Sequence, residues 1–258
     1  MNFENQGQPI ARVKFEGDKK KDRTLSVEKP NDPNVDTPFT ELMLQKPKEM
    51  IQHLPNKKRE RDILYICGQS GSGKSYYTMQ YANEYKKMYP KNPIYLFSSL
   101  NEDKGSIDKV KGLKRIKLQP ELLRSELTTK DFENSLVIFD DTDVIRDKLM
   151  RLKVLSILNM LLETGRHSKT SVVLTYHLPT NGLETRRILN EAHSVTIFPA
   201  NCGGRAMKYL LENYFGMSKD DIKRVKKLPS RWVTIIKTYP NVVLYEKGAY
   251  VLNDPDVD

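Results

Sequence analysis

The chain is poor in cysteine and histidine, with two cysteines and four histidines among 258 residues. Cys67 lies in a predicted core strand and Cys202 beside two glycines, so we expect no disulfide framework and a reducing compartment. The spacings of His167, His177, His193 and Cys202 match no zinc-binding pattern. The composition therefore argues against both a disulfide-stabilised fold and a zinc-dependent one.

Long apolar runs are also missing. No uninterrupted apolar segment approaches the roughly 18 residues of a membrane-spanning helix. The N-terminal segment is polar and lacks the apolar stretch of a signal peptide. We therefore expect a soluble protein with no membrane span and no secretion signal.

Acidic residues are too few to balance the basic ones. Lysine and arginine total 43 against 33 aspartates and glutamates, which gives a formal net charge of +10. Such a balance suits a polyanionic partner, nucleic acid first and an anionic membrane surface second, although many soluble basic proteins bind neither. At 258 residues, the chain is long enough for one α/β domain with appendages.

One stretch carries a strong chemical signal. Residues 68–75 read GQSGSGKS, after the apolar run at residues 63–67 and before a segment with helical spacing. This is the phosphate-binding loop pattern G-x-x-x-x-G-K-[ST] between a strand and a helix. Its small residues let successive N–H groups meet phosphates at the positive end of the helix. The alternative is a glycine-rich turn that binds nothing.

This loop predicts ATP binding with Mg²⁺. Lys74 would reach the β- and γ-phosphates, and the Ser75 hydroxyl would be a ligand to the metal. The residues expected to bind the nucleotide are Gly68, Gln69, Ser70, Gly71, Ser72, Gly73, Lys74, Ser75 and Tyr76.

The pattern along the chain predicts three parts. Residues 1–55 form an N-terminal arm in which residues 10–15 and 24–27 pair as a β-hairpin, followed by a short helix within residues 39–53. Residues 56–200 alternate strand and helix, which predicts a P-loop ATPase core with a mainly parallel sheet and helices on both faces. Residues 201–258 form a basic α+β extension with two helices and two strands, completing the domain.

Two helices of the core have clear apolar faces. Tyr77, Tyr81 and Tyr85 recur at helical spacing, and we interpret them as core packing. A long helix over residues 143–164 should bury one side rich in leucine. The leucines expected on that side are Leu149, Leu152, Leu155, Leu158, Leu161 and Leu162.

Two carboxylates end a predicted strand. Residues 135–141 read SLVIFDD, which places Asp140 and Asp141 at the edge of a parallel sheet where ligands bind. Asp140 is the candidate Mg²⁺ ligand with Ser75, and Asp141 is the candidate that orients or deprotonates the attacking water. The alternative is that one of the pair caps the following helix, a role for which Thr142 and Asp143 also compete.

Two further candidates complete the set. His177 ends a neighbouring strand, where it would contact the γ-phosphate or the catalytic water, but a lone histidine is more often structural. Arg166 lies in an exposed polar loop and is a candidate arginine finger, with a solvated surface arginine as the competing interpretation.

Residues 68–75, 136–141 and 165–177 together resemble the FtsK–HerA superfamily of DNA-pumping ATPases. The Arg-His pair at residues 166–167 and the segment at residues 185–191 narrow the resemblance to the genome-packaging ATPases of nucleocytoplasmic large DNA viruses and virophages. It covers residues 60–200 and, weakly, the tail to Tyr250. The superfamily commonly has Glu at the position of Asp141, which leaves the water-activating role open.

The resemblance implies a RecA-like P-loop fold of the ASCE type, in which the strand before His177 lies between the P-loop strand and the Asp140 strand. It also implies a ring of five or six identical subunits with ATP sites at their interfaces and double-stranded DNA in the channel. By position, it assigns Lys74 and Ser75 to Walker A, Asp140 and Asp141 to Walker B, His177 as sensor and Arg166 as finger. A viral protein of this kind would act in the host cytoplasm, at the virus factory or with the virion.

We therefore expect an ATPase that drives non-sequence-specific translocation of double-stranded DNA into a preformed capsid, whose protein is a further candidate partner. The expected DNA surface is the basic segment at residues 219–231, followed by the lysines of residues 109–117, with a solvated face as the alternative for each. Two other functions fit the same motifs: another DNA-dependent ATPase or helicase of replication or recombination, and a nucleotide-dependent capsid assembly or scaffold protein.

Overall fold

The chain divides into two compact units. The computed structural model describes residues 1–28, 39–100, 102, 106–180, 182–238 and 240–252. Arg59–Ala192 form one unit, here the loop unit. Met1–Lys58 and His193–Asp258 together form the other, here the terminal unit.

The loop unit is built on a parallel sheet with the strand order β7-β6-β8-β9-β5. The five strands are β5 (Ile63–Cys67), β6 (Ile94–Ser98), β7 (Leu113–Ile116), β8 (Leu136–Asp140) and β9 (Ser171–Tyr176). Every residue of β5, β8 and β9 is buried, because a parallel sheet is covered on both faces. The strand before His177 lies between the other two, as the resemblance implied.

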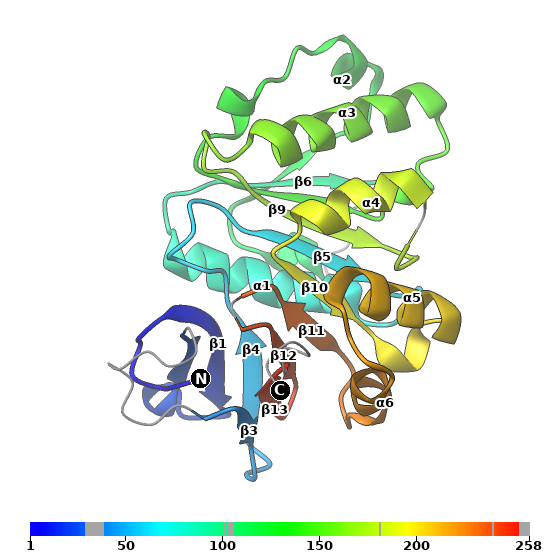
Figure 1. The fold of residues 1–258 in the computed structure, drawn as a ribbon. Coiled ribbons are helices and arrows are strands. Elements are labelled where there is room, and N and C mark those ends of the chain that lie inside the picture. Colours follow the sequence, from blue (N-terminus) through cyan, green and yellow to red (C-terminus); the bar gives the residue numbers. More distant parts are fainter. Residues whose placement is uncertain (29–38, 101, 103–105, 181, 239, 253–258) are drawn as a thin grey trace. The chain divides into compact units, whose positions relative to one another are not determined.

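Helices cover both faces of this sheet: α1 lies on one face, and α3 and α4 lie on the other (Figure 1). The helices of the loop unit are α1 (Lys74–Met88), α2 (Pro120–Arg124), α3 (Lys148–Thr164) and α4 (Gly182–Glu191). Tyr77, Tyr81 and Tyr85 of α1 are buried, which confirms the predicted core face. The loop unit therefore has the α/β fold of RecA-like P-loop ATPases.

Helix α3 is shorter than predicted. It begins at Lys148, where the Asp147 side chain caps it by accepting a hydrogen bond from the N–H of Met150 at 2.6 Å. Residues Thr142–Val144 form a separate 3₁₀ turn, η4. Leu149 and Leu152, predicted to face the core, are 65% and 53% exposed, because the buried face of this helix starts at Met150 and continues through Val154 and Ile157.

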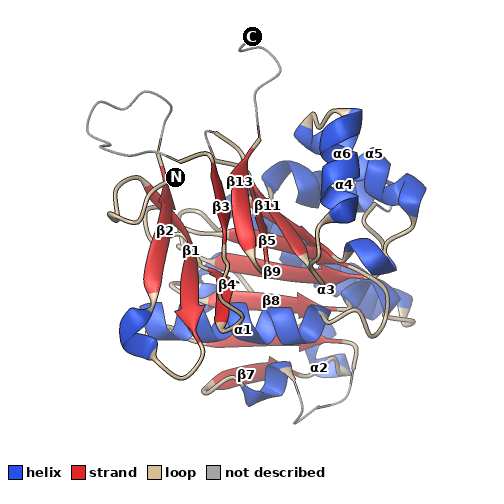
Figure 2. Cartoon of the chain, turned by 90° about the horizontal axis from the view of Figure 1, so that it is seen from below, coloured by secondary structure: helices blue, strands red, loops and turns tan. Residues whose placement is uncertain are grey.

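The terminal unit is antiparallel. One of its sheets has the order β2-β1-β4, made of β1 (Gln8–Phe15), β2 (Arg23–Val27) and β4 (Glu49–His53). The other strands pair in the order β3-β13-β12-β11-β10 and are β3 (Glu41–Met43), β10 (Ser194–Ile197), β11 (Val233–Ile236), β12 (Val242–Tyr245) and β13 (Gly248–Val251). Its helices are α5 (Gly204–Phe215) and α6 (Lys219–Lys227) (Figure 2).

Two expectations for the N-terminal residues were wrong. The helix predicted within residues 39–53 is replaced by strands β3 and β4, because long-range pairing with β13 and β1 decides the conformation there. The predicted hairpin of β1 and β2 is present, but it is not a separate arm. Ile10, Val13 and Leu25 share one hydrophobic core with Val242 and Leu244 near the other end of the sequence.

The compact units also divide the sequence at other points than the expected boundaries of residues 55 and 200. Strand β10 falls in the terminal unit because it pairs with β11 in antiparallel register, from Ser194 opposite Ile236 to Ile197 opposite Val233. Both cysteines, the buried Cys67 and the partly buried Cys202, are free in the structure. No helix within the described ranges is both long and apolar enough to cross a bilayer.

Candidate nucleotide site

The phosphate-binding loop connects β5 to α1 at the carboxyl end of the sheet. Gly71 and Gly73 have φ angles of +75° and +113°, which side-chain-bearing residues rarely adopt, so the tight curl of the loop requires glycine at both. The N–H of Gly68 donates to the carbonyl oxygen of Tyr176 at 3.1 Å, which ties the start of the loop to β9. The backbone is thereby shaped before any ligand arrives.

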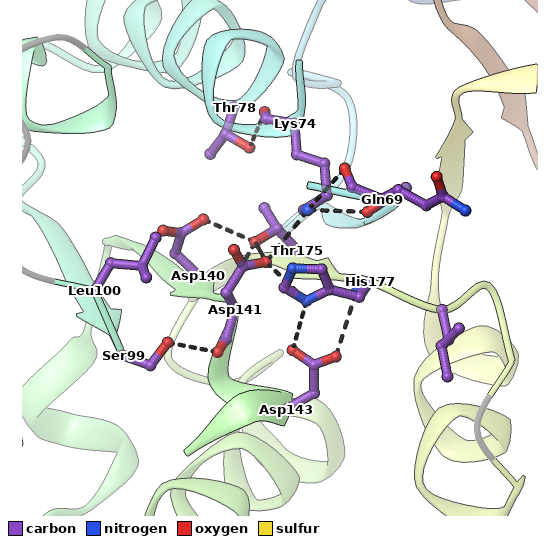
Figure 3. Close-up of polar contacts among 12 residues, drawn as sticks. Gln69, Lys74, Thr78, Ser99, Leu100, Asp140, Asp141, Asp143, Thr175 and His177 are labelled. Atoms are coloured by element: carbon purple, nitrogen blue, oxygen red, sulfur yellow. Dashed lines mark hydrogen bonds and ion pairs between the residues drawn. The ribbon is translucent and has the colours of Figure 1, made fainter. Parts of the chain in front are cut away.

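The Lys74 side chain is folded back into this loop and is only 5% exposed. Its Nζ donates to the carbonyl oxygen of Gly68 at 2.9 Å and lies 3.5 Å from Oδ1 of Asp141 (Figure 3). These contacts neutralise the buried ammonium group. A phosphate entering the loop would compete with both oxygens for it.

Thr175 on β9 holds the two carboxylates that end β8. Its buried hydroxyl donates to Oδ1 of Asp140 at 2.8 Å, and the N–H of Asp141 donates to the same hydroxyl at 3.0 Å (Figure 3). The register explains this contact, because Asp140 lies directly opposite Thr175 in the parallel ladder. The other oxygen of Asp140 accepts a bond from the Ser98 hydroxyl at 3.2 Å.

Asp141 has a left-handed backbone, with φ of +47° and ψ of +38°. This conformation is uncommon for a residue with a side chain, and such strain gathers at functional sites. Asp141 occupies the cap position of η4, but its side chain makes no capping hydrogen bond. Its carboxylate is instead directed to Lys74, at 3.5 Å, and His177, at 3.6 Å.

His177 lies just beyond β9, beside two carboxylates. Its Nδ1 is 3.6 Å from Oδ1 of Asp141 and 3.7 Å from Oδ1 of Asp143, and its backbone N–H donates to the other oxygen of Asp143 at 3.3 Å (Figure 3). Asp143 and Thr175 were not predicted as members of the site. The sequence does hold a signal for Thr175, which lies two residues before His177. Residues two apart along a strand face the same side of the sheet.

Burial affects the pKa of the Asp140 carboxyl group. Its carboxyl group is 5% exposed, and this desolvation raises its pKa above the ordinary value, although the hydrogen bond from Thr175 opposes the change. The nearby negative charge of Asp141 adds to the increase. A bound divalent cation would offset the cost of desolvating the Asp140 carboxylate. Mg²⁺ prefers oxygen ligands, so the carboxylate of Asp140 and the hydroxyl of Ser75 fit it by the chemistry of their donor atoms.

This pKa predicts that Asp140 destabilises the ligand-free protein. A raised folded-state pKa means that stability falls as the pH rises from the unfolded value through the folded one, so the charged carboxylate costs more stability at neutral pH than at acid pH. Replacing Asp140 with asparagine, which removes the charge, should therefore raise the melting temperature at pH 7. Thermal denaturation without nucleotide measures it. The gain should shrink as the pH is lowered toward the ordinary pKa of aspartate, and an unchanged or lower melting temperature at pH 7 would contradict the expectation.

Arg166 lies away from the other predicted residues. It follows α3 and precedes β9, so it is at the amino end of the sheet, whereas the phosphate loop is at the carboxyl end. A strand of five or six residues separates these edges by about 16–20 Å. The Arg166 side chain is 71% exposed and its Nε pairs with the carboxylate of Glu60, which lowers the pKa of Glu60. Arg166 therefore does not reach the loop of its own subunit.

No protein-family model matches the chain. Among solved structures, the genome packaging NTPase B204 from Sulfolobus turreted icosahedral virus 2 in complex with AMP is 15% identical, with a TM-score of 0.43, over 69% of this chain and 94% of that one. The pCW3 conjugation coupling protein TcpA with ATPγS is 11% identical, with a TM-score of 0.43, over 95% of this chain and 77% of that one.

In sequence, the chain is similar to the uncharacterized protein V3 of the Sputnik virophage. The two sequences are 43% identical over 195 residues, which is 74% of this chain and 78% of V3. Identity at this level over most of both sequences shows common descent, and the chain therefore belongs to the same protein family as V3 of the Sputnik virophage.

Proposed function

We propose that the protein is an ATPase that drives double-stranded DNA into a viral capsid. The observation that carries this proposal is the meeting of Lys74, Asp140 and Asp141 at one edge of the sheet, with Lys74 Nζ 3.5 Å from Asp141. A phosphate loop beside a carboxylate pair is the minimum set for hydrolysis of a nucleoside triphosphate. The DNA substrate is supported by the motif resemblance, the net charge of +10 and the virophage relative.

The contacts of Lys74 suggest how the site changes when ATP binds. The phosphates would accept hydrogen bonds from the N–H groups of the loop. They would also attract Lys74 Nζ away from the Gly68 carbonyl and the Asp141 carboxylate. The Asp141 carboxylate would then be free to orient or deprotonate the attacking water. Bound through Asp140 and Ser75, Mg²⁺ would neutralise charge on the phosphates.

His177 is placed to report on the same event. Because its Nδ1 lies near Asp141 and Asp143, any shift of Asp141 changes the charge around the imidazole. We assign it the role of sensor, in contact with the γ-phosphate or the catalytic water. Asp143 would hold the end of β9 in place through its bond to the His177 backbone.

Arg166 would serve the ATP bound to a neighbouring subunit. Its exposure and its place at the opposite edge of the sheet support action between subunits rather than within one. An arginine finger of this kind implies a closed ring of identical subunits. The virophage relative suggests that the ring acts in the infected host cell or with the virion, where the capsid protein is the candidate docking partner.

The DNA surface we propose is formed by basic side chains on and after α6. Ile222 and Val225 anchor this helix in the terminal unit. Lys223 and Arg224 are engaged with Asp220 and Glu41. The exposed cations that remain, and that make no ion pair within the described residues, are Lys219, Lys226, Lys227 and Arg231. Point charges without base-reading side chains suit the phosphate backbone of any DNA sequence.

The decisive experiment compares the ATPase rate with and without long duplex DNA at low salt, for the wild type and the Lys74→Ala variant. Stimulation by duplex DNA that Lys74→Ala abolishes is the expected result. No stimulation would exclude the translocase. Separation of the strands of a forked substrate would indicate a helicase, and binding of capsid protein with no effect of DNA would indicate a scaffold.

A second prediction concerns salt. The logarithm of the DNA-binding constant falls linearly with the logarithm of the salt concentration. Each phosphate contact that is lost should make this dependence less steep by about 1. A Lys226→Gln/Lys227→Gln double variant should therefore bind duplex DNA with a slope smaller by about 2. The matched control is Lys57→Gln/Lys58→Gln, which removes two exposed lysines far from α6 in the sequence. Equal slopes for the two double variants would place the DNA elsewhere.

A further inference from the structure

Tyr76 is the most exposed of the described aromatic side chains. It follows Ser75 in the first turn of α1 and is 61% exposed, whereas its neighbour Tyr77 is 4% exposed. Tyr77 belongs to the buried face that continues through Tyr81 and Tyr85, so Tyr76 lies outside that face. Within the described residues, the Tyr76 side chain has no hydrogen bond and no ring contact. The packing of the helix does not account for a large apolar ring at this position.

The direction of side chains on a helix places this ring near the phosphate loop. Cα–Cβ bonds tilt toward the amino end of a helix, so a residue covers the turn that precedes it. For Tyr76, that turn is the loop itself. Gln69, Ser70 and Gly71 at the tip of the loop are also exposed, and a side chain added at Gly71 would meet no other atom within 4 Å. A nucleoside joined to phosphates in the loop has to leave the loop on an exposed side.

We propose that Tyr76 stacks on the nucleobase of the bound nucleotide, an assignment that rests on the proposed nucleotide site. Every base has a π-face, so a tyrosine ring adds affinity without reading the hydrogen-bonding edge of the base. The ligand class is therefore nucleoside triphosphates, and ATP and GTP should gain equally from the ring. Base identity is left to groups other than Tyr76.

The test separates the base from the phosphates by comparing ATP, GTP and inorganic tripolyphosphate, each with Mg²⁺. Equilibrium titrations are made with the wild type, Tyr76→Ala and Tyr76→Phe. Tyr76→Ala should weaken ATP and GTP by the same factor, about 5- to 150-fold. Its affinity for tripolyphosphate should stay at the wild-type level, and Tyr76→Phe should restore the binding of both nucleotides because the ring is kept.

Tyr209→Ala is the matched control. Tyr209 is 52% exposed on α5 of the terminal unit, where its ring contacts that of Tyr214, and its loss should not change the affinity for ATP. A melting temperature near that of the wild type confirms that Tyr76→Ala is folded.

Two other outcomes would overturn the stacking assignment, and a third would overturn the nucleotide site itself. If Tyr76→Ala weakens tripolyphosphate as much as ATP, the residue shapes the loop and the stacking assignment is wrong. If it weakens neither, the assignment is also wrong, while the nucleotide site stands. If the wild type binds neither ATP nor tripolyphosphate, the nucleotide site itself is wrong and Tyr76 loses its role with it.

Discussion

Replacing Arg166 with alanine is expected to lower the ATPase rate of the assembled protein by about 1,000-fold or more, the contribution typical of an arginine finger. The physical reason is the loss of positive charge next to the γ-phosphate as charge develops there. Affinity for ATP should change much less, because the loop and Lys74 belong to the other subunit of the composite site. Steady-state hydrolysis and a nucleotide-binding assay separate the two effects.

The control for this variant is Arg187→Ala. Arg187 is another exposed arginine of the loop unit in an ion pair, with Glu163 at 3.1 Å, so it matches Arg166 in charge and setting. Its removal should leave the rate near that of the wild type.

Mixing two inactive variants tests whether Arg166 acts between subunits. Arg166→Ala subunits keep an intact phosphate loop, and Lys74→Ala subunits keep an intact finger. In mixed rings, some interfaces combine the two intact halves, so the mixture should hydrolyse ATP well above the sum of its components. A mixture as inactive as its parts, or an Arg166→Ala protein with normal activity, would show that Arg166 is a surface residue only.

Replacing Lys74 with alanine should lower ATP hydrolysis by about 100- to 1,000-fold, the range found when a preorganised charge or donor at the reacting group is removed. Lys74 is also the counter-charge of Asp141 in the ligand-free site. The variant therefore leaves Asp141 without its cation. Single-turnover hydrolysis at saturating ATP reports the loss on the chemical step, apart from any change in binding.

Lys91→Ala is the matched control for Lys74, because Lys91 is an exposed lysine shortly after the same helix. It should keep the wild-type rate. A Lys74→Ala protein that still turned over at a tenth of the wild-type rate or more would mean that the loop does not carry the chemistry.

The loop unit was largely predictable from the sequence because its signals are local. Strand β5, the glycines of the loop and the helix that follows lie within 26 consecutive residues, and each has its own pattern. The position of β9 between β5 and β8 came from the family resemblance, since periodicity gives no strand order. Asp140 and Asp141 could be proposed as site residues because a parallel sheet delivers the ends of its strands to one edge.

The terminal unit was harder to predict because its contacts join residues from opposite ends of the chain. Nothing near Leu42 or Ile51 in sequence shows that they pair with Ala249 and Val13. Thr175 escaped prediction for a similar reason, since its contact with Asp140 depends on strand register. Asp143 was considered only as a helix cap, whereas Asp147 caps α3.

The left-handed backbone of Asp141 bears on the choice of amino acid there. Asp and Asn tolerate this conformation better than longer side chains do, because a short polar group can bond to the nearby backbone. The superfamily that the motifs resemble commonly has Glu at this position. With φ at +47° and Lys74 Nζ already 3.5 Å away, the additional methylene of Glu would have to fit between the main chain and the ammonium group of the ligand-free site. The shorter side chain of Asp141 therefore suits the left-handed turn that follows β8. Its carboxylate extends less far from the main chain than the carboxylate of Glu would.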